Sequence, residues 1–132
     1  MRSRRVGQLG QLRRLCFVLD GALAQLHLRV KCETKPGESL RVVGWLPQMG
    51  SWKADKAPEM KTSRDEYPYW SVSIGVPLAA VTDTIKYKYV IRRPGGALQW
   101  EDAIADRQVK PRGSFISIAD GEFNQPSRAI TF

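Results

Sequence analysis

Four tryptophans in a chain of 132 residues are the side chains whose chemistry most needs an account: Trp45, Trp52, Trp70 and Trp100. Trp70 alternates with apolar residues, which is typical of a core anchor. Trp52 differs because it follows Gly50 in a loop with polar neighbours, and Trp100 ends a short apolar run just before two acids. An indole without apolar neighbours in the sequence either caps the edge of a core or binds a ligand.

A pair of exposed indoles has the chemistry that sugar rings require. The two faces of a glucose ring consist mainly of C–H bonds, and they lie favourably on the broad apolar face of an indole. Charged and amide groups nearby can then hydrogen-bond the rim of hydroxyls. Two indoles set at an angle favour the curved α-1,4-linked chain over a flat one. A basic groove with aromatic platforms also binds single-stranded nucleic acid, so a second class of ligand stays open.

Enzyme chemistry finds little support in the sequence. The only histidine, His27, has a polar position and no nucleophile motif beside it, and the two cysteines lack zinc-type spacing. Glycoside hydrolysis needs two carboxylates that face each other across the bond. Glu101 and Asp102 are neighbours and therefore point in opposite directions on a strand, with Asp106 a little further on. We predict no enzyme activity, no cofactor and no metal site.

The positive charge is concentrated near the N-terminus. The net charge is +8, but five arginines precede the first acid, Asp20. Residues 25–132 contain 16 lysines and arginines and 12 acids, which gives this part a net charge of +4. Because the remaining body is only mildly basic, we predict that nucleic acid is not a partner; steep salt dependence of binding would contradict this.

Residues 1–24 form a separate N-terminal extension. Apolar residues recur there at helical spacing: Leu9, Leu12, Cys16, Leu19 and Leu23. An Arg-rich, acid-poor start resembles an organelle transit peptide, so a plastid or other organelle is one expectation. Secretion is less favoured because the apolar stretch is short, and no stretch is long enough to span a membrane. A plain helix, a disordered extension or a fragment of a longer protein are the alternatives.

From residue 25 the apolar spacing changes to two, which predicts strands. We expect seven strands, separated by turns and loops, near residues 26–32, 39–44, 70–76, 85–92, 97–101, 107–110 and 114–118. No helix is expected in this part. The fold class is therefore all-β, an antiparallel β-sandwich of about seven strands with immunoglobulin-like architecture over residues 25–123. Residues 124–132 are expected to be a linker or frayed C-terminal tail.

The order of short motifs along residues 26–123 resembles a known family. No single motif is specific, but their ordered series is: Gly37-Glu38, Val42-Val43-Gly44, Met49-Gly50-Ser51-Trp52, Lys86-Tyr87-Lys88-Tyr89 and Trp100-Glu101 before Arg107. This series resembles the family-20 carbohydrate-binding module, or starch-binding domain. The resemblance implies non-catalytic binding of starch, glycogen or malto-oligosaccharides. It also implies a catalytic partner, either a separate protein or a domain absent from this chain.

The resemblance implies one main binding site. Its platform falls on Trp52, Trp100 and Lys88, with Glu101 beside them. Asp106 stands where the family often has an asparagine, and it can accept but not donate hydrogen bonds. Trp45 replaces a smaller residue and either widens this platform or packs under the loop.

A second site is expected to be weakened or lost. The family usually has a tyrosine before the Gly-Glu pair, where this chain has Pro36 followed by Gly37 and Glu38. Tyr67 or Tyr69 could substitute for the missing tyrosine.

Overall fold

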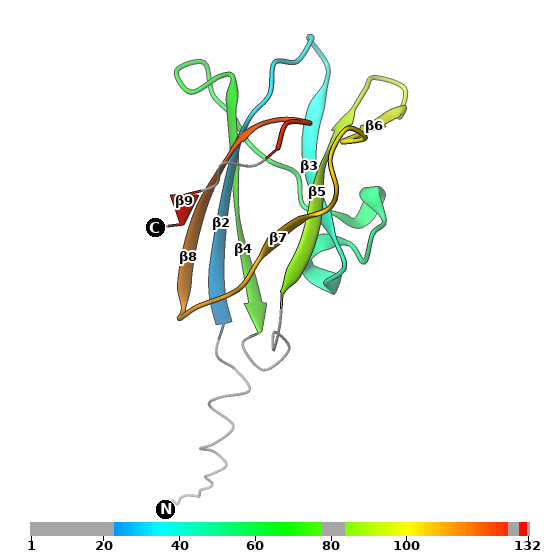
Figure 1. The fold of residues 1–132 in the computed structure, drawn as a ribbon. Helices are drawn as coiled ribbons and strands as arrows, with labels where there is room; N and C mark the ends of the chain where they lie inside the picture. Colours follow the sequence, from blue (N-terminus) through cyan, green and yellow to red (C-terminus); the bar gives the residue numbers. More distant parts are fainter. Residues whose placement is uncertain (1–22, 78–83, 127–129, 132) are drawn as a thin grey trace, which may run out of the picture.

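The protein folds into two β-sheets packed face to face (Figure 1). The computed structural model describes residues 23–77, 84–126 and 130–131. The first sheet has the order β4 (Tyr69–Pro77), β2 (Leu23–Lys31), β8 (Phe115–Glu122) and β9 (Ile130–Thr131). The second sheet has the order β3 (Ser39–Gly44), β5 (Ile85–Arg92) and β6 (Leu98–Trp100), with β7 (Arg107–Val109) also paired to β5. The predicted all-β sandwich is confirmed.

Alternation along the strands explains why the sheets pack. In β2 every second side chain is buried, and the residues between them are more exposed. Burial on one face of each sheet is what a two-layer sandwich requires. The core between the sheets includes Trp70, as predicted, and its indole Nε1 donates to the Cys32 carbonyl at 3.0 Å.

The structure differs from the sequence prediction in three details. The pair β2–β8 is parallel, because the chain crosses from the second sheet before β8 forms. β2 begins at Leu23, inside the predicted extension, and the two-residue strand β9 lies in the predicted tail. The loop after β3 contains two single-turn 3₁₀ helices, η1 (Pro47–Met49) and η2 (Ala54–Lys56). Such short elements leave no periodicity to detect. The helical or targeting prediction covers residues 1–24. Its last two residues, Leu23 and Ala24, belong to strand β2, and residues 1–22 lie outside the described residues.

Cys32 follows β2 and is buried. Burial raises the pKa of its thiol to about 12, so the thiol stays protonated near neutral pH. Within the part of the chain that the structure describes, no three His, Cys, Asp or Glu side chains gather as metal ligands. The same residues include no helix that is long and apolar enough to cross a membrane.

Candidate functional site on the outer face of the second sheet

Strand register brings the main candidate residues onto one surface, the outer face of the β3–β5–β6–β7 sheet, which we call the platform face. Val90 pairs with Arg41 on one side and Trp100 on the other. One row further, Val43 pairs with Lys88, whose Nζ lies 3.9 Å from Asp106. Cross-strand partners share a face of the sheet, so these two rows form a continuous surface.

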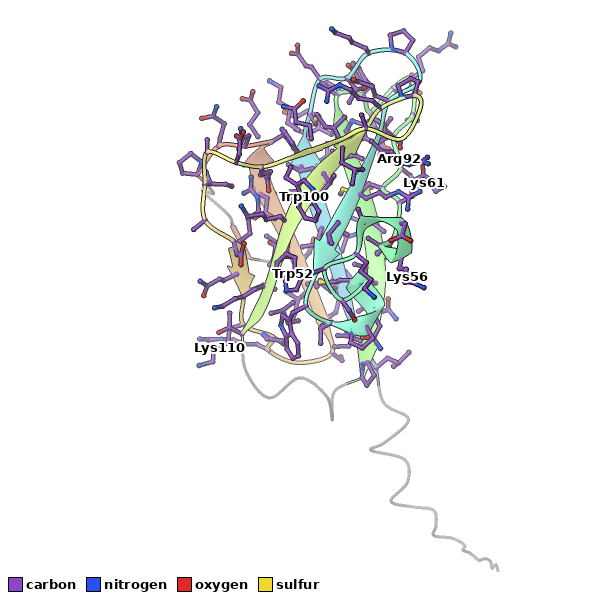
Figure 2. All side chains as sticks on the ribbon, turned by 90° about the vertical axis from the view of Figure 1, so that its right-hand side faces the viewer. Trp52, Lys56, Lys61, Arg92, Trp100 and Lys110 are labelled. Atoms are coloured by element: carbon purple, nitrogen blue, oxygen red, sulfur yellow. The ribbon has the colours of Figure 1, made fainter. Side chains whose placement is uncertain are left out.

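Trp100 rests on a small hydrophobic cluster of its own. Four buried residues make up this cluster, two from the strands of the sheet and two from the loop that follows β3, and Trp100 packs against them: Val43, Val90, Ala54 and Ala57. Arg41 Nη1 donates to the Ala54 carbonyl at 3.0 Å and so ties this loop to the sheet. Figure 2 looks onto the platform face, where Trp52 and Trp100 lie one above the other. The structure therefore places both indoles on the same side of the molecule.

Trp52 is held in a backbone conformation that L-residues seldom adopt. Gly50, Ser51 and Trp52 have φ angles of 84°, 51° and 66°. The left-handed conformation costs about 1–2 kcal/mol for a residue with a Cβ. Backbone bonds from Ser51 N to the Leu46 carbonyl (3.0 Å) and from Trp52 N to the Gly44 carbonyl (2.8 Å) hold the loop in place. The loop thus presents an indole that is 38% exposed. A strained backbone conformation of this kind is kept only where the surrounding contacts hold it in place.

Lys88 links β5 to the loop that follows Trp100. Its Nζ donates to the carbonyls of Glu101 at 2.7 Å and Ile104 at 3.0 Å. An ammonium group has three N–H donors, so one remains for Asp106 or for a ligand. The side chain of Lys88 is 18% exposed and that of Asp106 is 41% exposed. Both are therefore accessible next to the indole pair.

Glu101 does not lie on the surface as the resemblance implied. It is completely buried, and its Oε2 accepts from Arg107 Nη2 at 2.6 Å and from Asn124 N at 2.7 Å. Its Oε1 accepts from Tyr89 N at 2.9 Å. Because both oxygens are occupied inside the protein, the expected direct contact of Glu101 with a ligand is wrong for this structure. The role of Glu101 is to fix the backbone segments that precede and follow it.

The buried Glu101–Arg107 pair belongs to a larger polar network between the sheets. Asp120 accepts from the hydroxyls of Tyr87 at 2.6 Å and Tyr89 at 2.7 Å. Burial raises the pKa of both tyrosines, and the nearby carboxylate adds to this. Burial opposes the charge of Arg107, but hydrogen bonding and attraction to Glu101 outweigh it and raise the Arg107 pKa. The sequence does not reveal this network, because Tyr87 and Tyr89 alternate with Lys86 and Lys88 in the pattern that predicts core residues of a strand.

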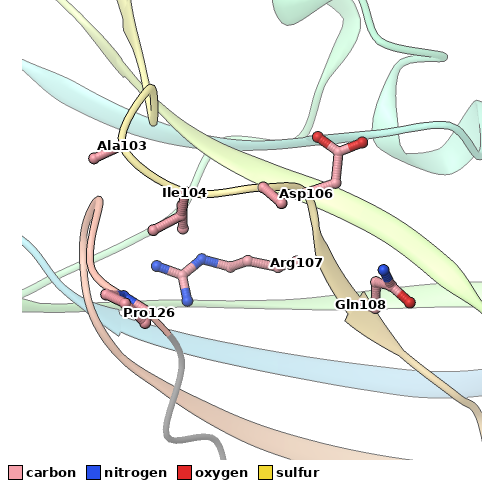
Figure 3. Close-up of a pocket in the computed structure, with 7 residues that line it drawn as sticks. Ala103, Ile104, Asp106, Arg107, Gln108 and Pro126 are labelled. Atoms are coloured by element: carbon pink, nitrogen blue, oxygen red, sulfur yellow. The ribbon is translucent and has the colours of Figure 1, made fainter.

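This network has a direct consequence for the platform. Trp100 and Asp106 are the chain neighbours of Glu101 and Arg107, so the buried ion pair fixes the loop from which both site residues project. Figure 3 shows Asp106 and Arg107 pointing to different sides of this loop. The Arg107 side faces a cavity of about 440 Å³ between this loop and the C-terminal segment, lined by Ala103, Ile104, Ala105, Asp106, Arg107, Gln108 and Pro126.

Trp45 follows β3 on the same sheet. Its backbone N–H donates to the Lys86 carbonyl at 3.3 Å, and the residue is 42% exposed. The preceding Gly44 points inward, because a Cβ there would lie 2.5 Å from Met49 Sδ. Trp45 therefore follows a position that faces the core, which favours an outward side chain.

The residues expected for a second site lie at the end of the sandwich beside the turn before β3. Gly37 has a φ of 87° in this turn, and Glu38 pairs with Arg93 Nε at 3.2 Å. The Tyr67 hydroxyl donates to the Thr34 carbonyl at 2.9 Å and accepts from Thr34 N at 2.7 Å. Tyr67 is thus brought close to the turn, although its hydroxyl is already engaged.

Tyr69 is not part of that arrangement. It lies on the outer face of the first sheet, where it pairs with Lys31. The Arg29 guanidinium lies over its ring, 4.5 Å from the centroid. One face of this aromatic ring is therefore occupied by a cation of the same sheet.

The family match assigns this small β-sandwich to the class of carbohydrate-binding modules. The family model for the starch-binding domain matches residues 24–114, and the chain belongs to this family. The resemblance seen in the sequence is thereby confirmed.

Comparisons with known proteins agree. The family-20 module of the maltotetraose-forming amylase from Pseudomonas saccharophila is 27% identical, with a TM-score of 0.57 over 76% of this chain and all of that one. An AA13 family lytic polysaccharide monooxygenase from Pyricularia oryzae is 30% identical over 69% of this chain. A cyclomaltodextrin glucanotransferase from a Bacillus species is 34% identical over 64% of it. The chain spans only 24% and 12% of the length of these two relatives.

Proposed function

We propose that the platform face binds α-1,4-glucan chains such as starch, glycogen and malto-oligosaccharides. Trp52 and Trp100 stack on glucose rings of one chain, and Lys88 and Asp106 hydrogen-bond the hydroxyl rims. The observation that carries this proposal is the placement of two indoles, 48 positions apart in the sequence, on one face of the molecule (Figure 2). C–H groups of a sugar ring lie favourably on such a surface.

Two further features of the site support this assignment. The loop tolerates left-handed backbone at Trp52, and the hydrophobic cluster beneath Trp100 fixes the second indole. Aromatic groups that are rigid before binding lose little conformational entropy on association. Trp45 is exposed at the next row of the sheet and extends the platform toward Lys86.

The module's role is to bring a catalytic protein to the polymer. The relatives named above are enzymes several times longer than this chain. A shallow platform buries only part of a sugar chain, so the affinity of one site is modest. Linkage to an enzyme, or a polymer with many sites, raises the effective affinity through avidity.

Retention on insoluble starch tests the proposal. The wild-type protein should be retained and should be eluted by a soluble cyclic malto-oligosaccharide. The double variant Trp52→Ala/Trp100→Ala should be found in the unbound fraction. Variant Phe115→Ala is the matched control, because it removes an aromatic residue that is 61% exposed on the first sheet. Equal retention of the wild type and the double variant would overturn the site.

A further inference from the structure

Positive charge gathers around the indole pair. Seven cations lie on the platform face or in the loops that border it: Arg41, Lys53, Lys56, Lys86, Lys88, Arg92 and Lys110. Four carboxylates lie in the same region: Asp55, Glu59, Asp102 and Asp106. The resulting excess of three accounts for most of the +4 charge of residues 25–132.

Within the described ranges 23–77, 84–126 and 130–131, most of these cations have no carboxylate partner. Among the described residues, only Lys88 of this group lies within 4 Å of a carboxylate oxygen, at 3.9 Å from Asp106. Five of the others are exposed to solvent, Lys53, Lys56, Lys86, Arg92 and Lys110, whereas Arg41 is half-buried and donates to the Ala54 carbonyl. In Figure 2, Arg92 and Lys56 lie on one side of the indole pair and Lys110 lies on the other. A neutral glucan offers hydroxyl oxygens to these cations but no negative charge that would balance them.

Resting on the proposed function, we infer that the platform prefers α-glucan chains that carry phosphate monoesters. A phosphate monoester has a charge of about −1.5 to −2 at neutral pH and three strong acceptor oxygens. Lysine and arginine hydrogen-bond such oxygens more strongly than neutral donors do. Stacking on the indoles holds the chain while neighbouring cations receive its phosphates.

Lys86 and Arg92 are the most suitable cations to carry this preference. Both are exposed on β5, at opposite ends of the strand that runs under the platform. Lys88 and Val90 lie between them on the same face. A chain that crosses the platform along β5 would therefore meet a cation at each end.

Nucleic acid is the competing anionic ligand, because single strands also combine stacking with phosphate contacts. The observations favour glucan, since the chain belongs to the starch-binding-domain family. A phosphate on every nucleotide would also require more cations along the path than the few placed here.

The test compares maltoheptaose with maltoheptaose that carries one 6-phosphate, using tryptophan fluorescence at about 20 mM and about 300 mM salt. At low salt the phosphorylated chain should bind about fivefold more tightly, as expected for one or two exposed ion pairs. At high salt this preference should largely disappear. The variant Lys86→Gln/Arg92→Gln should lose the preference and keep the affinity for neutral maltoheptaose. The control Lys31→Gln/Arg112→Gln removes the same charge elsewhere and should keep both.

Three results would overturn the inference. Equal affinity for the two sugars at low salt would show that the charges do not select phosphate. If the variant Lys86→Gln/Arg92→Gln still preferred the phosphorylated sugar, other residues would bind the phosphate. A thymidine oligonucleotide that binds as tightly as the phosphorylated sugar would assign the face to nucleic acid. If neither sugar binds, the proposed function itself falls, whereas binding of the neutral sugar alone refutes only this inference.

Discussion

The outer faces of the two sheets arise from the same strand alternation, yet they carry different chemistry. On the first sheet, the outward positions in the centre of β4 and β8 hold small side chains: Ser71, Ser73, Gly75, Ser117 and Ala119. On the second sheet, comparable positions hold Trp100, Lys88 and Lys86. The fold needs only that outward residues tolerate water. The first face also carries aromatic and basic residues, such as Phe115, Tyr69 and Arg29. The second face holds two tryptophans, one of which packs on a hydrophobic cluster of its own, and this arrangement points to a ligand rather than to folding.

The two faces also differ in how they are supported. Side chains of the first face meet mainly their cross-strand neighbours, as His27 Nδ1 meets Ser73 Oγ at 2.9 Å. The second face has a hydrophobic cluster under Trp100 and a buried ion pair beneath the following loop. A binding surface must hold its side chains in position before the ligand arrives. This difference shows that the interior beneath the platform contributes to the site.

The largest expected effect tests that buried support. Glu101→Gln removes the charge that compensates Arg107, whose side chain is only 2% exposed. Breaking a buried pair in this way costs about 3 kcal/mol of unfolding free energy. The melting temperature should fall by about 10 °C, measured by circular dichroism.

The binding result of the same variant decides between two roles of Glu101. As a positioning residue, Glu101 affects maltoheptaose affinity only through Trp100 and Asp106, so affinity should fall together with stability. An unchanged melting temperature combined with lost binding would instead mean direct contact with the sugar. Asp106→Asn is the control for stability, because Asp106 is exposed and should change it by less than about 0.5 kcal/mol.

The second prediction concerns the indoles themselves. Trp52→Ala and Trp100→Ala should each weaken maltoheptaose binding by about 2 kcal/mol, or about thirtyfold, as expected for a central aromatic contact. Isothermal titration calorimetry measures this loss. Phe115→Ala on the first face should leave the affinity unchanged. If Phe115→Ala and Trp52→Ala weakened binding equally, the distinction between the faces would disappear.

The sequence predicted the strands better than it predicted the site. Period-two alternation located β3 at its observed bounds and β5 at the residues expected, because burial on one face enforces that pattern. The parallel pairing of β2 with β8 depends on contacts distant in the sequence, which periodicity does not encode.

Individual site residues show the same limit. The polar neighbours of Trp52 left two alternatives, an indole that caps the core edge and one that binds a ligand, and the structure shows an indole that is 38% exposed. In the sequence, Glu101 is simply an acid beside a tryptophan. The structure shows that it is buried and that it accepts a hydrogen bond from the buried Arg107. Charge alone suggested a surface residue, because buried carboxylates are rare unless paired.

A smaller effect is expected at Asp106, where the family often has an asparagine. Asp106→Asn adds an N–H donor next to Lys88 and keeps the acceptor. One added hydrogen bond to a glucose hydroxyl should tighten maltoheptaose binding by about 0.5–1 kcal/mol. Calorimetry at two salt concentrations measures it, and the gain should not depend on salt. Weaker binding by the variant would mean that the carboxylate itself accepts a hydroxyl proton that the amide cannot replace.

The smallest effect is expected on the first face, at Arg29 and Tyr69. An exposed cation over an aromatic ring contributes about 0.5 kcal/mol of stability. Arg29→Met and Tyr69→Leu should each lower stability slightly, and a double-mutant cycle in urea should give a coupling of that size. Neither change should alter maltoheptaose affinity, because Arg29 already occupies one face of the ring. Loss of affinity in Tyr69→Leu would show that a second sugar site survives on the first sheet, and the two faces would then share the binding function.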